Sequence, residues 1–270
     1  MFRPNLLKQR LGRGEKLFGS WIATGNATNV EILGHSGFDY LLIDLEHGQG
    51  EISDLIAMLR AAETTGTPCV VRVPWNDPVT LKRVLDAGVD SVMIPMIENE
   101  DEAKAAVRAC RYPPLGSRGY AAPLVRASTF GAVSDYIHRA ADNLLIILQI
   151  ESAGAVAQAR TISAVDGVDI VFIGVNDLAG SIGRLEQLDH PDVRALVKQA
   201  ETAIQASGRW LGTVPSAGAS WQELFDAGYQ FVPVASDTGL LRDAAFASVR
   251  EQRRYRDGGQ TAQPARKGGY

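Results

Sequence analysis

The chain has 270 residues and a formal net charge of −4, with 46% hydrophobic and 21% charged residues. These values are ordinary for a soluble globular protein, and the negative charge argues against nucleic acid or an anionic membrane as a partner. Cys69 and Cys110 stand apart with no CxxC motif, so both are expected to be buried rather than bonded or metal-binding. No segment is typical of a signal peptide or a membrane span, which predicts a cytoplasmic protein with small-molecule partners.

Short segments rich in Val, Ile, Leu and Phe recur along the chain and predict eight strands that are buried on both faces. In chain order these segments are residues 17–23, 35–44, 69–73, 86–95, 145–150, 165–174, 210–214 and 226–235. Four of them contain a glycine between a helical pattern and the apolar run, at Gly37, Gly88, Gly167 and Gly228. Such a glycine is expected to end a helix in the left-handed conformation.

Helices are predicted between the strands, because apolar residues recur there at spacings of three and four. The predicted helices cover residues 55–62, 79–87, 103–109, 153–162, 193–206 and 221–227, and a further helical pattern includes the basic stretch 250–256. The expected N-caps are Asp54, Asp77, Ser152 and Asp192. Strands that alternate with helices form parallel βαβ units, and eight units close into a barrel of about 250 residues.

We therefore predict one α/β domain, a single (β/α)₈ TIM barrel over residues 1–256. Residues 257–270 are rich in glycine and polar residues and are expected to be a disordered tail. Residues 112–143 form a long insertion after the fourth strand, which we expect at the functional end of the barrel.

Polar residues stand at the ends of several predicted strands, where barrels of this kind carry their active sites. They are Asp44, Glu46, His47, Arg72, Gln149, Glu151, Asn176 and Asp177. This concentration of charge at one rim indicates an active site rather than positions chosen for packing.

Lysine is informative by its absence from the predicted strands. The lysines are Lys8, Lys16, Lys82, Lys104, Lys198 and Lys267, all in helical patterns or near the termini. An aldolase that forms a Schiff base needs a lysine inside the barrel. The residues therefore favour a bound divalent cation as the electron sink that stabilises a carbanion.

Glu151 and Asp177 are the expected metal ligands, because the fifth and sixth strands should be neighbours about 5 Å apart. An all-oxygen site completed by water and substrate favours Mg²⁺ or Mn²⁺ over zinc. The alternative is that both residues cap the helices that follow them. Asp177 suits a cap, whereas Glu151 at the end of an apolar strand is harder to explain in that way.

Two further groups have a catalytic and a structural interpretation. Asp44 and His47 are either a general acid/base pair, in which the carboxylate orients the imidazole, or a loop histidine without a role. Arg72 interrupts an apolar strand and needs an anionic partner, which is a substrate, a fixed carboxylate such as Asp44, or both.

At these residues the sequence resembles the class II pyruvate aldolases of the HpcH/HpaI family. The similar segments are GFDYLLIDLEHG (37–48), VVRVPWNDP (70–78), VLDAGVDSVMIPM (84–96), RYPPLGSRG (111–119), LQIES (148–152) and GVDIVFIGVNDLA (167–179). The resemblance runs from about residue 5 to residue 255. It implies a lyase that cleaves 4-hydroxy-2-keto acids to pyruvate and an aldehyde.

The resemblance also implies roles for individual residues. Glu151 and Asp177 would bind Mg²⁺ or Mn²⁺, with Co²⁺ as a third candidate, and the ion would chelate pyruvate. Arg72 would stabilise the enolate oxygen, and His47, oriented by Asp44, would move the proton of the aldol hydroxyl.

Four other positions take family roles at the substrate. Asp86 would reach the site of a neighbouring subunit, which implies a homo-oligomer, commonly a hexamer. Trp21 would line the pocket, although a core tryptophan is an equally simple interpretation, and Gln149 would lie beside the metal. The amide of Asn176 would hold the pyruvate carboxylate.

One segment departs from the family pattern. The family loop reads Gly-Pro-x-Asp, whereas here Val175 and Asn176 stand between Gly174 and Asp177. The missing proline frees the backbone and puts the preferred acceptor in doubt. Two other functions stay open: a CoA-thioester lyase of the citrate lyase β-subunit type, and a barrel that binds a keto acid without catalysis.

Overall fold

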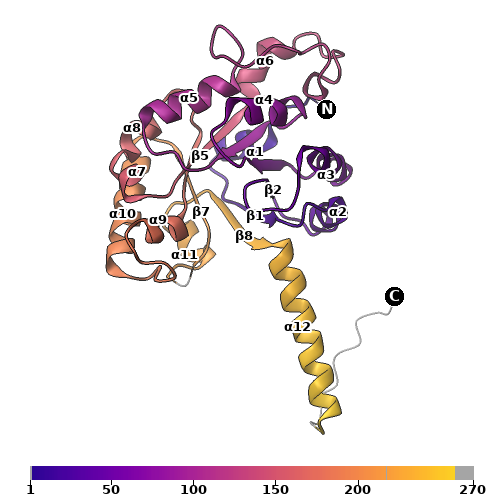
Figure 1. The fold of residues 1–270 in the computed structure, drawn as a ribbon, viewed down its shortest axis with the longest axis vertical. Helices are drawn as coiled ribbons and strands as arrows, with labels where there is room; N and C mark the ends of the chain where they lie inside the picture. Colours follow the sequence, from indigo (N-terminus) through magenta and orange to yellow (C-terminus); the bar gives the residue numbers. More distant parts are fainter. Residues whose placement is uncertain (1, 217, 259–270) are drawn as a thin grey trace.

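Eight parallel strands close into a barrel in chain order, with β8 beside β1 (Figure 1). The strands are β1 (Leu17–Ile22), β2 (Tyr40–Asp44), β3 (Cys69–Arg72), β4 (Ser91–Ile94), β5 (Leu145–Ile150), β6 (Ile170–Ile173), β7 (Trp210–Thr213) and β8 (Phe231–Ser236). The structure is a computed structural model that describes residues 2–216 and 218–258. It confirms the predicted (β/α)₈ barrel and all eight strands.

The strands are mostly apolar because nearly all of their side chains are buried, on both faces of the sheet. One set of side chains fills the barrel and includes Tyr40, Phe172 and Phe231, while the alternate set packs against the helices. Each of the four repeated glycines has a positive φ, between 93° and 101°, as predicted. Cys69 and Cys110 are free and buried, as expected.

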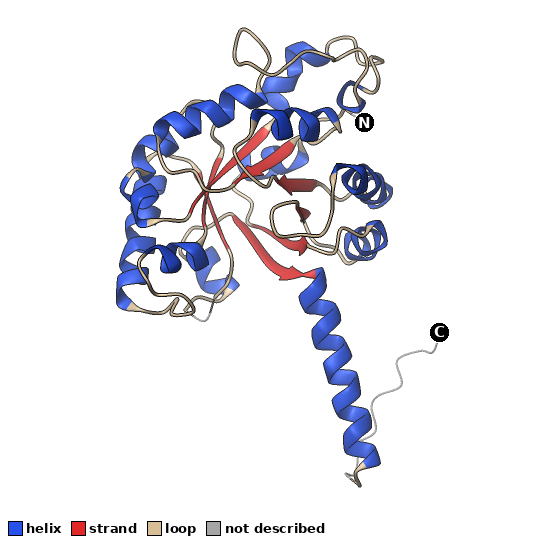
Figure 2. Cartoon of the chain, in the orientation of Figure 1, coloured by secondary structure: helices blue, strands red, loops and turns tan. Residues whose placement is uncertain are grey.

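Helices lie around the barrel, except α12, which projects away from it (Figure 2). They are α1 (Leu6–Gly12), α2 (Ala27–His35), α3 (Ile52–Thr65), α4 (Pro78–Asp86), α5 (Glu100–Cys110), the 3₁₀ turn η1 (Arg126–Ser128), α6 (Tyr136–Asn143), α7 (Ala153–Ala157), α8 (Ala159–Ala164), α9 (Val175–Ser181), α10 (Pro191–Ala206), α11 (Trp221–Asp226) and α12 (Asp237–Arg256). The six predicted helices are present, but the segment 153–162 is divided between α7 and α8. No helix within residues 2–216 and 218–258 is long and apolar enough to cross a membrane.

Two of the four predicted N-caps are correct. The side chains of Asp77 and Ser152 accept hydrogen bonds from the first turns of α4 and α7. Asp54 and Asp192 were placed wrongly, because each lies inside the first turn of its helix. Glu51 precedes α3 and forms a capping box with Asp54, and the His190 side chain caps α10.

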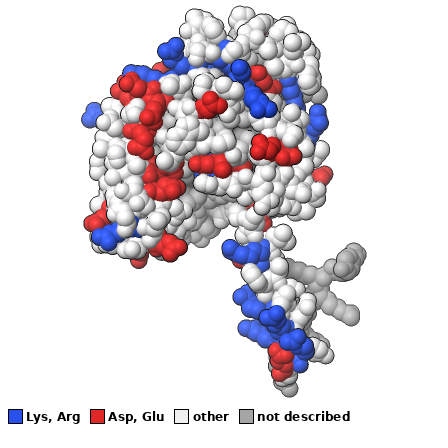
Figure 3. Space-filling view, in the orientation of Figure 1, with Lys and Arg blue, Asp and Glu red and all other residues white. Residues whose placement is uncertain are grey.

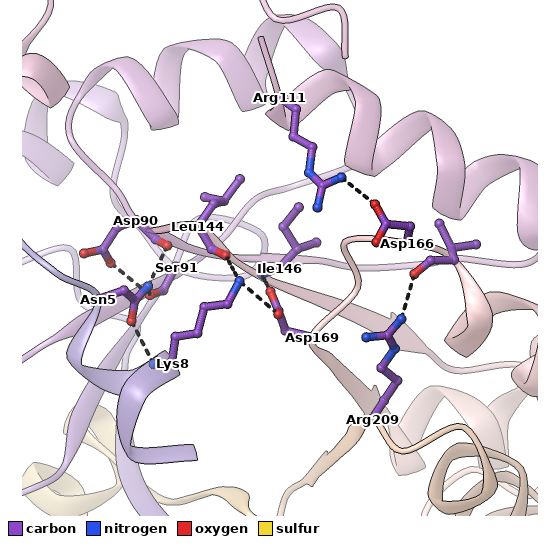
Figure 4. A network of polar contacts seen from close by, with 11 residues as sticks. Asn5, Lys8, Asp90, Ser91, Arg111, Leu144, Ile146, Asp166, Asp169 and Arg209 are labelled. Carbon is purple, nitrogen blue, oxygen red and sulfur yellow. Dashed lines mark hydrogen bonds and ion pairs between the residues drawn. The ribbon is translucent and has the colours of Figure 1, made fainter. Parts of the chain in front are cut away.

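The amino end of the barrel is closed by α1 and a polar network (Figure 4). Leu7 and Leu11 of α1 pack with the side chains inside the barrel. The Lys8 ammonium donates to the Leu144 carbonyl at 2.7 Å and lies 3.1 Å from Asp169. Since this end is sealed, the opposite end, where the strands finish, is available for a functional site.

The insertion lies at the amino end of the barrel, so the expectation that it borders the functional end is wrong. Residues 112–143 connect α5 to the start of β5, and such a connection returns to the end where strands begin. Arg126 in this segment bonds the Ala87 carbonyl at 3.0 Å and Glu63 at 2.8 Å, both close to the ends of helices that lead into strands.

Helix α12 leaves the barrel and extends away from it (Figure 1). Of its 20 residues, all of them described, only Asp237 is buried. Its exposed large apolar side chains are Leu240, Leu241, Phe246, Val249 and Tyr255. The helix ends at Arg256, the predicted domain boundary, whereas the predicted tail falls mainly on residues 259–270, outside the described residues.

Candidate active site

Arg72 is buried at the end of β3 and held by two carboxylates. Its Nε and Nη2 donate hydrogen bonds to the Asp44 carboxylate at 2.9 and 2.7 Å. Asp44 lies on β2, directly opposite Arg72 on β3. Its Nη1 lies 3.0 Å from Oε2 of Glu46. The Trp21 ring covers the guanidinium at 4.4 Å from the ring centroid. The fixed-carboxylate interpretation of Arg72 is therefore correct, and the substrate contact stays a prediction.

Glu151 is 3% exposed, and both of its carboxylate oxygens accept hydrogen bonds. Oε1 accepts from the Met96 backbone at 2.8 Å, and Oε2 accepts from Nε2 of Gln149 at 2.5 Å. A Cβ atom on Gly174 would come within 2.5 Å of Oε2, so only glycine leaves room for this carboxylate. Ser152 caps the following helix, which excludes a capping role for Glu151.

Burial is the main cause that raises the pKa of Glu151 to about 7, and the nearby charges of Glu46 and Asp177 contribute to this rise. The hydrogen bonds from Met96 and Gln149 act in the opposite direction. A buried carboxylate that is hard to ionise beside other carboxylates is typical of a site completed by a cation.

Asp177 and Asn176 lie exposed in the first turn of α9, directly after β6. β5 and β6 are paired neighbours, as predicted, so Asp177 follows the strand next to the one that ends at Glu151. The N-cap of α9 is Gly174, so Asp177 is not the cap. The buried Oε1 atom of Gln149 has no hydrogen-bond partner among the described residues, which leaves a polar acceptor beside Glu151.

His47 lies on the loop after β2 with its imidazole 71% exposed. Its Nε2 is 3.9 Å from Oε1 of Glu46. Asp44 accepts from the backbone N–H groups of Glu46 and His47, at 3.0 and 3.3 Å, and from Arg72. Within the described residues no contact joins Asp44 to the imidazole, so the expected orientation of the ring by Asp44 is not observed.

Asp86 and Trp21 lie in very different places. Asp86 ends α4 at the amino end of the barrel, remote from Glu151 of its own chain, and bonds Arg118 at 2.6 Å. Trp21 is half-buried between Arg72 and Phe172. Its ring lies edge-on to that of Phe172, with 6.5 Å between the ring centroids. Trp21 also lines a hollow of about 370 Å³ between the ends of β7 and β8 and the start of α12.

Met96 was missed at the sequence level although it holds Glu151 through its backbone. Its φ of 54° lies in the left-handed region, where a residue with a side chain is strained. No sequence signal marks such a conformation at a methionine. The requirement for Gly174 has a weak signal, since a glycine at the end of an apolar strand is unusual.

The rim carries more negative than positive charge. The carboxylates of Asp44 and Glu46 pair with the guanidinium of Arg72, and those of Glu46 and Asp177 lie close enough to Glu151 to affect its pKa. Figure 3 shows acidic side chains in several groups over the barrel and basic ones toward its edge and along α12. No three His, Cys, Asp or Glu residues within 2–216 and 218–258 are arranged to hold a metal. The expected ligand pair, Glu151 and Asp177, stays a prediction.

A closed parallel barrel with buried charged residues where its strands end is the arrangement of a (β/α)₈ enzyme. The model of the HpcH/HpaI aldolase/citrate lyase family matches residues 17–244. This chain belongs to that family.

Named relatives cover nearly the whole chain. A 2-dehydro-3,6-dideoxy-6-sulfogluconate aldolase of Pseudomonas putida is 41% identical over 235 residues, which are 87% of this chain and 92% of the relative. A 4-hydroxy-2-oxo-heptane-1,7-dioate aldolase of Salmonella dublin is 39% identical over 243 residues, which are 90% of this chain and 92% of the relative. A solved HpcH/HpaI aldolase/citrate lyase family protein from Burkholderia cenocepacia J2315 has a TM-score of 0.88 at 38% identity. The match covers 92% of this chain and 99% of that protein. The chain is accordingly an enzyme of an aldolase family.

Proposed function

We propose that this enzyme is a divalent-metal-dependent aldolase that reversibly cleaves 4-hydroxy-2-keto acids to pyruvate and an aldehyde. The observation that carries the proposal is the buried Glu151 carboxylate, oriented by Met96 and Gln149 beside Asp177. Two relatives named as aldolases, at 41% and 39% identity, support this reaction class.

The residues at the rim fit a divalent cation. Glu151 and Asp177 would hold it through oxygen atoms, which Mg²⁺ and Mn²⁺ prefer. The excess of acidic groups and the unpartnered Oε1 of Gln149 favour a cation with bound water at this place. When bound, the cation supplies Lewis-acid polarisation of a keto oxygen. None of the lysines in the described ranges lies in a strand, which argues against an imine.

Arg72 and His47 would divide the remaining work. The Arg72 guanidinium is already oriented by Asp44, Glu46 and Trp21, so it can stabilise negative charge on a substrate oxygen without reorganisation. The exposed His47 imidazole can take the proton from the aldol hydroxyl in cleavage and return it in synthesis.

The acceptor aldehyde would occupy the hollow beside Trp21, which also reaches Ser236 and Leu240. The names of the two relatives describe substrates that end in a sulfonate and in a second carboxylate. We therefore expect an aldehyde with an anionic end, whose charge would be bound outside this hollow, because the hollow is lined by Asp243 and by no Lys or Arg.

The experiment is a cleavage assay on these two 4-hydroxy-2-keto acids, with pyruvate detected enzymatically. Cleavage should disappear after exhaustive chelation and return with Mg²⁺ or Mn²⁺. Full activity in the chelated protein would contradict the metal requirement. Cleavage of a CoA thioester without cleavage of either acid would favour the thioester lyase, and binding of pyruvate without turnover would favour the non-catalytic barrel.

We also propose that the enzyme is a homo-oligomer, a hexamer by family resemblance, in which α12 packs on a second copy and Asp86 approaches a neighbouring site. Helix α12 exposes five large apolar side chains and buries almost nothing on its own barrel. It carries five arginines and three acidic residues, a net charge of +2, within a chain of net charge −4. An apolar helix surface of opposite charge to the rest of the molecule suits a second copy.

Light scattering of Leu241→Glu tests this assembly. The variant should dissociate, whereas the control Leu185→Glu should not. Leu185 lies outside α12 and is 67% exposed, against 66% for Leu241. A wild-type monomer, or equal behaviour of the two variants, would contradict the assembly.

A further inference from the structure

The one buried residue among the 20 of helix α12, all of them described, carries a charge. This residue, Asp237, begins the helix directly after β8 and is 5% exposed. It is not needed as the helix cap, because the preceding Ser236 is the N-cap and accepts from the Gly239 N–H at 3.0 Å. A buried carboxylate without a capping role must be explained by the groups that it binds.

The Asp237 carboxylate binds the segment that follows β1. Its Oδ1 accepts from the backbone N–H of Ala23 at 2.9 Å, and its Oδ2 accepts from the backbone N–H of Thr24 at 3.2 Å. Oδ2 also accepts from the Thr24 hydroxyl and, at 3.5 Å, from the Asn29 side chain. Since β8 pairs with β1, this carboxylate joins the last strand to the segment after the first strand where the barrel closes.

The same segment supports the turn after β2. The Ala23 carbonyl accepts from the backbone N–H of Gln49 at 2.9 Å. Gly25 has a φ of 65°, in the left-handed region, and a Cβ atom at this position would lie 2.8 Å from the backbone of Gly50. The backbone after β1 therefore packs directly against the residues that follow His47.

We infer that Asp237 is a positioning residue of the active site: by holding Ala23 and Thr24, it fixes the backbone of the turn that carries His47. Within residues 2–216 and 218–258, the hydrogen bonds of its carboxylate go to the segment after β1 and to Thr238. Asp237 thus acts through two successive backbone contacts and not on the substrate. The kinetic consequence rests on the proposed aldolase function, whereas the backbone contacts do not.

Replacing Asp237 by asparagine breaks this support, because both carboxylate oxygens accept from backbone N–H groups. Whichever way the new amide turns, its N–H₂ group faces the N–H of either Ala23 or Thr24, which then loses its acceptor. Asp169→Asn is the matched control. Asp169 also accepts from a backbone N–H, that of Ile146 at 2.9 Å, but it lies at the sealed amino end of the barrel (Figure 4).

Hydrogen exchange followed by mass spectrometry measures the effect without turnover. In Asp237→Asn, the Gln49 amide should exchange about tenfold faster or more, although it does not bond Asp237, because its acceptor Ala23 is no longer held. In Asp169→Asn, the Gln49 amide should exchange at the wild-type rate. Wild-type exchange at Gln49 in Asp237→Asn would overturn the inference. So would an equal acceleration over the whole barrel, which would show only a loss of overall stability.

Kinetics provide the second measurement. Cleavage needs the proton transfer at the aldol hydroxyl that is assigned to His47, whereas exchange of the methyl protons of pyruvate does not. In Asp237→Asn, kcat for cleavage should therefore fall about tenfold to a hundredfold and methyl-proton exchange much less. Asp169→Asn should leave both rates at their wild-type values. Equal losses of the two rates in Asp237→Asn would contradict a role through this turn.

Two further results separate the possible failures. A wild-type protein without aldolase activity would refute the proposed function, and hydrogen exchange at Gln49 would still decide the role of Asp237. If Asp237→Asn does not fold, Thr24→Val takes its place, because it removes one donor and leaves the carboxylate intact. Gln49 should exchange faster in this variant too, and a wild-type rate there would overturn the inference.

Discussion

Replacing Glu151 by glutamine should stabilise the metal-free protein at pH 8.5 and change its stability little at pH 5. Burial raises the pKa of this carboxyl group to about 7, from an ordinary value of 4.5. Between these values the unfolded chain ionises while the folded chain keeps its proton. The stability of the wild type therefore falls as pH rises through this window and is constant above it.

The size of the effect follows from the two pKa values. Their difference of about 2.5, at about 1.36 kcal/mol for each unit of pKa, destabilises the ionised folded state by about 3 kcal/mol. Glutamine lacks this charge but loses one acceptor, because either Met96 or Gln149 would face an amide nitrogen. That loss costs about 1 kcal/mol, so the net gain expected at pH 8.5 is about 2 kcal/mol.

Urea unfolding in chelator at the two pH values measures this gain. Adding Mg²⁺ at pH 8.5 should make the wild type more stable than the variant. An ion at 100 times its Kd stabilises the wild type by about 2.7 kcal/mol, whereas the variant lacks one of the two carboxylates that bind the ion. A Glu151→Gln variant that is less stable than wild type without metal at pH 8.5 would refute the electrostatic reasoning. So would a difference that is the same at pH 5 and pH 8.5.

Three further substitutions have defined outcomes. Gly174→Ala should weaken Mn²⁺ binding about 5- to 150-fold in a metal titration, because its Cβ would lie 2.5 Å from the Glu151 carboxylate and overpacking costs about 1–3 kcal/mol. Unchanged affinity would show that Glu151 moves freely. Arg72→Lys should lower both cleavage and pyruvate proton exchange by about 10²–10³-fold, since an ammonium cannot keep both bonds to Asp44; a rate near wild type would exclude a role for the planar guanidinium. His47→Ala should reduce cleavage by about 10²–10⁴-fold and exchange much less, and equal losses would assign His47 to enolisation.

The barrel was predictable because its strands are buried on both faces, so each of them is a short apolar run with its own boundary. The repeated glycines added a conformational signal that the positive φ values confirm. Helix α12 was predicted only in part, because a helix with little contact to its own barrel lacks a strong apolar stripe. The break at Gln158 between α7 and α8 also leaves no periodic signal.

The site was predictable in its composition but not in its pairings. Residues at strand ends must meet at one rim, so Asp44, Arg72 and Glu151 could be grouped from the chain alone. Which carboxylate faces His47 depends on the direction of side chains in the turn after β2, and this direction is not encoded in spacing. The left-handed backbone of Met96 was equally inaccessible, because nothing at a methionine announces it.

Exchange of the methyl protons of pyruvate into D₂O, followed by NMR, measures enolisation separately from cleavage, because it needs neither an acceptor aldehyde nor a known substrate. We predict no exchange in the chelated protein, rapid exchange after addition of Mg²⁺ or Mn²⁺, and no rescue by either ion in Glu151→Ala or Asp177→Ala variants that still fold. Exchange at the wild-type rate in the chelated protein, or in either variant, would contradict a metal-dependent enolisation at these two carboxylates.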